Sequence, residues 1–260
     1  MWTDSHAHLG FYGSPAHVGD VLRRAGEAGV TRIVNVGDTL EASRKAIKLA
    51  ERFEGIYAAV GVHPHGADQV RSSTLKELRQ LASHPRAVAV GEIGLDYYRD
   101  RSPHSQQAKA FRAQLDLALE LDLPIIIHNR EANGDVLEVL DELSIPGEKV
   151  LMHCFSGDRA FAHEVIGRGS YVSLAGTLTF TNPRHLPEVS QEVPLDRVLI
   201  ETDSPFLAPH PYRGQTNEPA YLPYVGEALA GIKGLPVEEI ARLTSENAAR
   251  FFGLPPLDQP

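Results

Sequence analysis

The chain has 260 residues, of which 42% are hydrophobic, and its formal net charge is −9 at pH 7. This length suits one α/β barrel, which needs about 250 residues, so we expect a single domain spanning residues 1–260. The negative charge argues against broad adhesion to nucleic acid, because a polyanion gains affinity mainly from Lys and Arg. It does not exclude local contacts of metal ions and a few arginines with one phosphate.

Eight short apolar runs are typical of β-strands, and longer amphipathic segments follow most of them. In chain order the predicted strands span residues 2–4, 32–36, 57–62, 87–92, 125–128, 150–153, 171–174 and 198–201. Near-continuous apolar strands that alternate with helices predict a parallel sheet covered by helices, and eight such units close into a barrel. We therefore predict an α/β fold, a single (β/α)8 barrel of the TIM type.

Helix signals lie between these strands. Ser14 is placed to cap the first helix, and a longer helix is predicted after Pro103. Near the end of the chain, Pro236 and Ser245 are each expected to open a short helical segment that covers the outside of the barrel. For the proline-rich stretch 205–223 we predict a loop that shapes substrate access, with a plain surface connector as the alternative.

Potential metal ligands lie at or just beyond the ends of five predicted strands. The first two are separated by one residue, and an extended backbone sends residues two apart to the same side, so both imidazoles can reach one ion. The full set is His6, His8, Glu92, His128, His153 and Asp203. Each alone is more often an ordinary hydrogen-bonded or solvated side chain. Together they predict a metal-dependent hydrolase, because a barrel builds its active site from the C-terminal ends of its strands.

Six nitrogen and oxygen ligands exceed what one tetrahedral ion needs, which predicts two divalent metal ions bridged by a carboxylate. We assign one ion to His6, His8 and Asp203, the other to His128 and His153, and the bridge to Glu92. The residue types do not select among Zn²⁺, Mg²⁺ and Mn²⁺, since imidazole suits zinc while carboxylate and water suit the harder ions.

With these motifs in view, the chain resembles the TatD family of metal-dependent hydrolases, which are relatives of the amidohydrolase barrels. The similarity covers nearly the whole length and rests on Asp4-Ser5-His6-Ala7-His8, Gly61-Val62-His63-Pro64-His65, Gly91-Glu92-Ile93-Gly94-Leu95-Asp96-Tyr97, Ile127-His128-Asn129-Arg130, His153-Cys154-Phe155-Ser156-Gly157 and Glu201-Thr202-Asp203-Ser204-Pro205. The resemblance implies deoxyribonuclease activity, with DNA or another phosphodiester as the substrate.

Two positions set the chain apart within this resemblance. Many amidohydrolases place a carboxylated lysine as the bridge at this strand, whereas this chain has Glu92. Family members often carry a basic segment before Asn-Glu-Pro, whereas this chain has Arg213-Gly214-Gln215-Thr216 in that place. The smaller number of positive charges there argues against tight DNA binding.

Three carboxylates form the predicted catalytic set. Two ions can lower the pKa of a shared water toward neutrality, and Asp203 is the candidate to orient that water and take up its proton. Glu201 lies two residues earlier, on the same side of the strand, and is predicted to act as a proton partner or to hold a metal ligand. Glu92 completes the set as the bridge.

Predicted substrate contacts lie just beyond the third and fifth strands. They are His63, His65, Asn129 and Arg130. The guanidinium of Arg130 has the fork geometry that suits phosphate oxygens, and an ordinary surface salt bridge is the alternative. Asp96 and Tyr97 are predicted to brace the loop that follows Glu92.

Two other functions compete with phosphodiester cleavage. The same pair of ions could hydrolyse a different ester or an amide, for example an aminoacyl ester, because activated water also attacks a carbonyl carbon. A barrel that binds metal or nucleic acid without catalysis is disfavoured by the complete ligand set. Activity on a DNA oligonucleotide compared with small esters would separate these hypotheses.

The sequence also bears on location and on cysteine chemistry. No run approaches the roughly 18 apolar residues of a membrane helix, and the first residues lack the basic and apolar regions of a signal peptide. We therefore expect a cytoplasmic protein without membrane contact, and no obligate protein partner is evident. Cys154 is the only cysteine, and we predict a buried small residue rather than a nucleophile.

Overall fold

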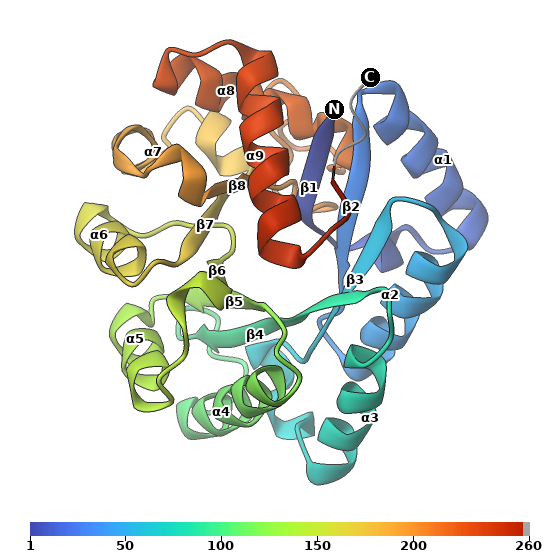
Figure 1. The fold of residues 1–260 in the computed structure, drawn as a ribbon, viewed down its shortest axis with the longest axis vertical. Coiled ribbons are helices and arrows are strands. Elements are labelled where there is room, and N and C mark those ends of the chain that lie inside the picture. Colours follow the sequence, from blue (N-terminus) through green and yellow to red (C-terminus); the bar gives the residue numbers. More distant parts are fainter. Residues whose placement is uncertain (257–260) are drawn as a thin grey trace.

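A computed structural model describes residues 1–256, and an eight-stranded sheet in which neighbouring strands pair in parallel forms its centre. The strands follow chain order around the sheet (Figure 1). Their bounds are β1 (Trp2–Ala7), β2 (Val30–Val36), β3 (Ile56–Val60), β4 (Ala87–Asp96), β5 (Ile125–Arg130), β6 (Val150–Met152), β7 (Tyr171–Leu174) and β8 (Val198–Ile200). The predicted (β/α)8 barrel is confirmed.

Helices alternate with the strands and surround the sheet (Figure 1). They are α1 (Pro15–Glu27), α2 (Leu40–Arg52), α3 (Ser72–Ala82), α4 (His104–Glu120), α5 (Asn133–Glu142), α6 (Arg159–Gly167), α7 (Leu186–Glu192), α8 (Leu222–Lys233) and α9 (Val237–Phe252). As predicted, Ser14 caps α1, and its hydroxyl oxygen accepts a hydrogen bond from the backbone N–H of His17 at 3.3 Å. Such a cap satisfies one of the free N–H groups of the first turn.

Between the last strand and the first, the barrel closes through bonds that lie beside the metal-ligand motifs. The backbone N–H of Asp203 donates to the carbonyl of His6 at 2.9 Å, and that of His8 donates to the carbonyl of Ser204 at 2.8 Å. The buried carboxylate of Asp4 accepts from the backbone N–H of Thr202 at 3.0 Å and from its hydroxyl at 2.6 Å. Closing the barrel therefore also brings the segment after β8 against β1 and the turn that follows it, at the predicted site.

Three strands extend further at their C-terminal ends than the apolar runs predict, which corrects the expected boundaries. β1 includes His6, β4 continues through Glu92 to Asp96, and β5 includes Arg130. The pairing of β4 with β5 explains two of these differences, because the ladder continues from Ile93 to Asp96 on β4 although polar residues interrupt the apolar runs. These predicted site residues therefore lie on paired strands rather than on loops.

Two layers of apolar side chains fill the fold. Alternate strand residues such as Ile125 and Ile127 face the surrounding helices, whereas Ile126 belongs to a separate cluster. That second cluster combines one residue or more from each of β2 to β8 with the end of α9: Val34, Val36, Tyr57, Ala59, Val88, Ala89, Ile126, Leu151, Tyr171, Leu199, Ala248, Phe251, Phe252 and Leu254. Since successive side chains of a strand face opposite sides, this cluster is the interior of the barrel.

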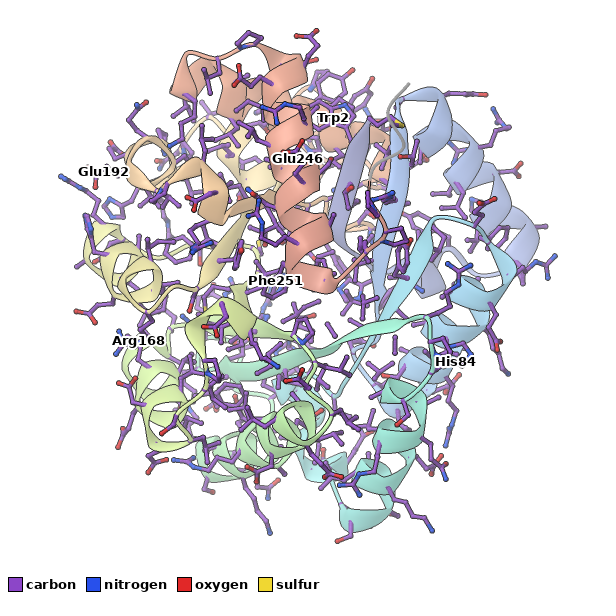
Figure 2. All side chains as sticks on the ribbon, viewed as in Figure 1. Trp2, His84, Arg168, Glu192, Glu246 and Phe251 are labelled. Carbon is purple, nitrogen blue, oxygen red and sulfur yellow. The ribbon has the colours of Figure 1, made fainter. Side chains whose placement is uncertain are left out.

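The C-terminal segment corrects two predictions. Pro236 and Ser245 were expected to open separate short helices, but α9 runs unbroken through Ser245. The hydroxyl of Thr244 donates to the carbonyl of Ile240 at 2.8 Å, so this polar side chain is satisfied without interrupting the helix. The end of α9 does not cover the outside of the barrel: Phe251 points toward the middle of the ring of strands and plugs one mouth (Figure 2).

The predicted site residues lie at the mouth of the barrel opposite the one that α9 closes. Ile126, Leu151 and Leu199 belong to the cluster that α9 plugs. Two residues further along the chain, on the same inward side, stand His128 on β5 and, just beyond β6 and β8, His153 and Glu201. Stretch 205–223 follows at this end and contains the short 3-10 helix η6 (Pro219–Tyr221) and the first two residues of α8, so the predicted loop is shorter than expected. Among residues 1–256, no helix is long and apolar enough to cross a membrane.

Candidate metal centre

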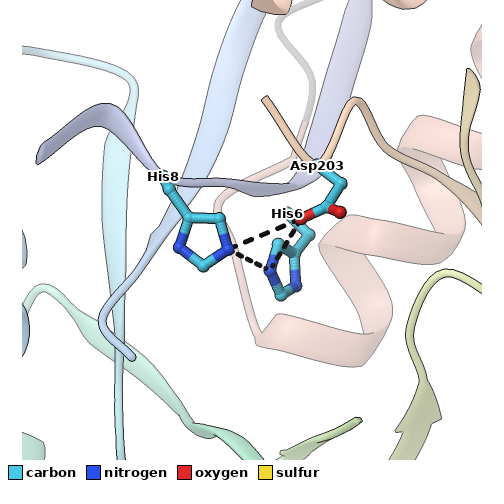
Figure 3. Close-up of side chains that lie close together, drawn as sticks. All are labelled: His6, His8 and Asp203. Atoms are coloured by element: carbon cyan, nitrogen blue, oxygen red, sulfur yellow. Dashed lines mark hydrogen bonds and ion pairs between the residues drawn. The ribbon is translucent and has the colours of Figure 1, made fainter. Parts of the chain in front are cut away.

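Two histidines of the first strand and the turn after it meet an aspartate that follows the last strand. The Nε2 atoms of His6 and His8 lie 3.2 Å apart (Figure 3). Oδ1 of Asp203 lies 3.7 Å from Nε2 of His6 and 3.5 Å from Nε2 of His8. Nδ1 of His8 donates to the carbonyl of Val36 at 3.0 Å, which orients the ring so that Nε2 faces the group.

Glu92 stands between two groups of imidazoles. Its Oε2 lies 3.6 Å from Nε2 of His6 and 3.7 Å from Nε2 of His8. Its Oε1 lies 2.7 Å from Nδ1 of His128 and 2.9 Å from Nε2 of His153. Each carboxylate oxygen thus faces a different pair of histidines, which is the arrangement that a ligand bridging two ions requires.

Glycines on β4 allow Glu92 to approach the neighbouring strand. A Cβ at Gly91 would lie 2.6 Å from Cβ of Ile126, and one at Gly94 would lie 2.0 Å from the carbonyl oxygen of His128. Gly94 also has φ of 145°, a conformation that residues with side chains rarely adopt. Because both positions lack a side chain, β4 and β5 come close enough for Glu92 to contact His128.

The spacing of these atoms fits divalent cations. Bonds of about 2.0–2.2 Å around a tetrahedral ion place the ligand atoms roughly 3.3–3.6 Å apart. The contacts among His6, His8, Asp203 and Oε2 of Glu92 range from 3.2 to 3.7 Å. In the second group, Nδ1 of His128 and Nε2 of His153 are 3.5 Å apart, while their shorter contacts with Glu92 have hydrogen-bond lengths.

The pKa values of the carboxylates and imidazoles show that positive charge stabilises the carboxylates of this group. Burial raises the pKa of Glu92, but the His153 charge and hydrogen bonds from His128 and His153 bring it well below its ordinary value. Burial lowers the pKa of His8, but the hydrogen bond and charge of Asp203 outweigh it and raise the pKa to about 9. Nearby carboxylates also raise the pKa of His128 and His153, whereas burial and the His153 charge lower that of His6. The imidazoles of His8, His128 and His153 therefore hold protons that balance the carboxylates, and a cation must displace these protons to bind.

Glu201 lies behind His153 rather than in the open site. Its side chain is fully buried, and Oε1 lies 3.2 Å from Nδ1 of His153. The backbone N–H of Cys154 donates to the same oxygen at 2.8 Å, and the hydroxyl of Ser173 donates to Oε2 at 2.5 Å. Cys154 is half-buried rather than buried as predicted. Desolvation of its thiol and the Asp203 carboxylate nevertheless raise the pKa well above the ordinary value, which disfavours a nucleophilic thiolate.

Asp96 does more than brace the loop after Glu92. Its Oδ2 lies 2.8 Å from Nε2 of His65 and 3.3 Å from Nε2 of His128. Burial raises the pKa of Asp96, but the hydrogen bond with His128 brings it below the ordinary value. The ionised Asp96 therefore orients His128 so that Nδ1 faces Glu92. His63, His65 and Asp96 also form a group with the spacing of a cation site.

The four predicted substrate contacts lie at the same end of the barrel but in different surroundings. Nε2 of His63 is 3.5 Å from Oε1 of Glu92, and these two residues form a possible ligand group with His128. His65 pairs with Asp96, as described above. Asn129 donates through its side-chain amide to Asn133 at 2.7 Å. The guanidinium carbon of Arg130 lies 4.0 Å from the centre of the Tyr98 ring.

Aromatic rings at the mouth were not anticipated from the sequence. Phe11 and Phe206 are 56% and 48% exposed, and their ring centres lie 5.8 and 6.0 Å from that of His8. Tyr98, which is 59% exposed, lies under Arg130. Only the positions of Phe11 and Phe206 in the sequence could have indicated them, because each stands three residues after a candidate ligand, His8 or Asp203.

A parallel barrel that gathers histidines and carboxylates around one central carboxylate belongs to the class of metal-dependent hydrolases. A family model described as TatD related DNase matches residues 3–253. The chain belongs to this TatD family of metal-dependent hydrolases.

Individual relatives match over nearly the whole chain. The metal-dependent hydrolase YabD of Bacillus subtilis, itself described as uncharacterized, is 44% identical over 97% of this chain and 99% of its own length. A protein of Erwinia tasmaniensis named 3'-5' ssDNA/RNA exonuclease TatD is 36% identical over 90% of this chain and 93% of its own. The crystal structure of YJJV, a TatD homologue from Escherichia coli K12, aligns with a TM-score of 0.90 at 30% identity and covers 98% of both chains.

Proposed function

We propose that the protein is a deoxyribonuclease that cleaves phosphodiester bonds with the help of two divalent cations. The observation that carries the proposal is the position of Glu92, whose two carboxylate oxygens face two different pairs of histidines. We assign one cation to His6, His8 and Asp203, the second to His128 and His153, and the bridge to Glu92. The ions, when bound, lower the pKa of a water and offset the charge that develops on phosphate oxygens.

Exposure distinguishes the roles of the three carboxylates. The side chain of Asp203 is 13% exposed, against 5% for Glu92 and 0% for Glu201. Asp203 is therefore the carboxylate that an attacking water can reach, and we assign it the role of orienting that water and accepting its proton. Glu201 accepts three hydrogen bonds and keeps Nε2 of His153 directed at Glu92, so we assign it a positioning role.

Substrate contacts follow from the side chains around the ligands. Arg130 presents a guanidinium at the end of β5, two residues beyond His128, where it can pair with a phosphate oxygen. His63 and His65 line the adjacent turn, and Asn129 lies between His128 and Arg130. These local contacts suit a chain of net charge −9, because they need no broad basic surface. The exonuclease name of the Erwinia relative supports a nucleic-acid substrate.

The test is hydrolysis of a labelled DNA oligonucleotide with Mn²⁺, Mg²⁺ or Zn²⁺, beside small carboxylic esters and an aminoacyl ester. We expect cleavage of DNA that a chelator abolishes and that the double variant His6→Ala/His8→Ala lacks, with an unchanged circular dichroism spectrum. Hydrolysis of carboxylic esters alone would contradict the phosphodiesterase proposal. Cleavage of DNA by the metal-free double variant would contradict the assigned ligands.

A further inference from the structure

Two exposed phenylalanines form an apolar corner beside the metal centre. Phe11 and Phe206 lie with ring centres 5.5 Å apart and planes at 72°, and each also meets the ring of His8 edge-on. Folding normally removes such rings from water, so two of them in contact at the mouth of a polar site indicate a binding surface.

Buried hydrogen bonds hold this corner in place. Phe11 belongs to the 3-10 helix η1 (Leu9–Tyr12), and the hydroxyl of Tyr12 donates to the carbonyl of Asn217 at 2.5 Å. The side-chain amide of Asn217 donates to the carbonyl of Phe206 at 2.6 Å and to that of Thr202 at 2.8 Å. Asn217 is fully buried, so it ties the turn after β1 to the loop after β8. The two rings are thus preorganised, although water surrounds much of their surface.

We propose that Phe11 and Phe206 hold one unpaired nucleobase of the nucleotide bound at the His6, His8 and Asp203 end of the site. This assignment rests on the proposed function and adds to it the two residues that contact a base free of a partner. A flat base can stack on one ring while its edge meets the face of the other, the two arrangements that aromatic pairs favour. A base inside a duplex is covered on both faces and does not offer this contact.

The chemistry of the corner also predicts its selectivity. Phenylalanine has no hydrogen-bonding group, so the corner distinguishes the presence of a base from its absence and does not read base identity. The contact with His8 places the base beside the ligand group of one ion rather than beside Arg130, which follows His128 at the other group. The corner and Arg130 therefore serve different parts of the same substrate.

Equilibrium binding tests the proposal without requiring turnover. We would titrate the Mn²⁺-loaded protein with 2'-deoxyadenosine 5'-monophosphate, deoxyribose 5-phosphate and hexyl phosphate by isothermal calorimetry. Base stacking predicts that the nucleotide binds roughly five- to a hundredfold more tightly than the sugar phosphate. Phe11→Ala and Phe206→Ala should each remove much of this difference and leave deoxyribose 5-phosphate binding unchanged.

Matched variants separate stacking from other effects. Leu119→Ala removes another exposed apolar side chain, on α4, and should change nothing. Phe206→Leu keeps apolar surface but lacks an aromatic face. It serves in place of Phe206→Ala if that variant fails to fold, and it should still weaken nucleotide binding. Three results would each overturn the proposal. The variants could weaken the binding of all three ligands equally, the wild type could bind hexyl phosphate as tightly as the nucleotide, or the wild type could bind the nucleotide no more tightly than deoxyribose 5-phosphate. Loss of DNA cleavage with the binding preference intact would instead count against the proposed function.

Discussion

Replacing Glu201 by glutamine separates a positioning role from a proton-transfer role. Oε1 of Glu201 accepts from His153 and Cys154, and glutamine can keep both bonds through its one carbonyl oxygen. Its amide would face Ser173, whose hydroxyl can turn to accept. The variant Glu201→Gln therefore preserves the shape of this buried cluster and removes its charge.

The magnitude follows from the bond to His153. Hydrogen bonds to charged groups contribute about 1.5–3 kcal/mol and neutral ones about 0.5–1.5 kcal/mol, so losing the charge costs about 1–2 kcal/mol. We expect binding of the ion assigned to His128 and His153 to weaken roughly five- to thirtyfold in Glu201→Gln. Because the ligand geometry is kept, kcat should return close to the wild-type value once Mn²⁺ saturates the site.

The assay is the initial rate of DNA cleavage as a function of Mn²⁺ concentration, together with calorimetric titration of the metal-free protein. Glu246→Gln is the matched control, because Glu246 lies on α9 and forms an exposed pair with Arg242 at 2.9 Å. A kcat that stays about a hundredfold or more below wild type at saturating Mn²⁺ would refute the positioning role and identify Glu201 as a proton partner.

Three further predictions follow from the structure. Phe251→Ala should lower the free energy of unfolding in urea by about 3–5 kcal/mol, because it removes a large side chain from the barrel interior. Phe11 is exposed, so Phe11→Ala should change the free energy of unfolding by only about 0.5 kcal/mol. Equal effects of the two changes would show that α9 does not seal the interior. Glu92→Gln should weaken both ions and abolish cleavage, and calorimetry that still finds two ions at wild-type affinity would rule out the bridge. Metal affinity should rise between pH 6 and pH 8, because the pKa of His8 is raised to about 9 and a bound cation displaces its proton. Calorimetric titrations in buffers of different ionisation enthalpy should report this proton release. A metal affinity that does not change with pH would contradict the prediction.

Much of the architecture could be read from local patterns. Runs such as 125–128 and 198–201 are apolar because parallel strands are buried on both faces, and this property identifies them without knowledge of their partners. Residues at the ends of such strands share one mouth of a barrel, which is why His153 and Asp203 could be expected near one another. The structure does bring them to one site, together with Glu92.

Other features depend on contacts between distant residues. The extension of β4 to Asp96 relies on pairing with β5, and the polar Glu92 interrupts the apolar run that would mark it. The continuity of α9 depends on polar side chains finding partners, and its role as a plug depends on where the barrel leaves space for Phe251. The position of Asp96 behind His128 likewise exists only once the two strands are paired.

By itself, the sequence determined the eight-unit alternation and the identity of the residues that can bind cations, because periodicity and side-chain chemistry are local properties. Only the tertiary structure decided that the two oxygens of Glu92 face different histidines and that Glu201 lies buried behind His153. It also decided that Phe11 and Phe206, far apart in the chain, share one corner. Distance and burial arise from the closure of the barrel, and no stretch of sequence contains them alone.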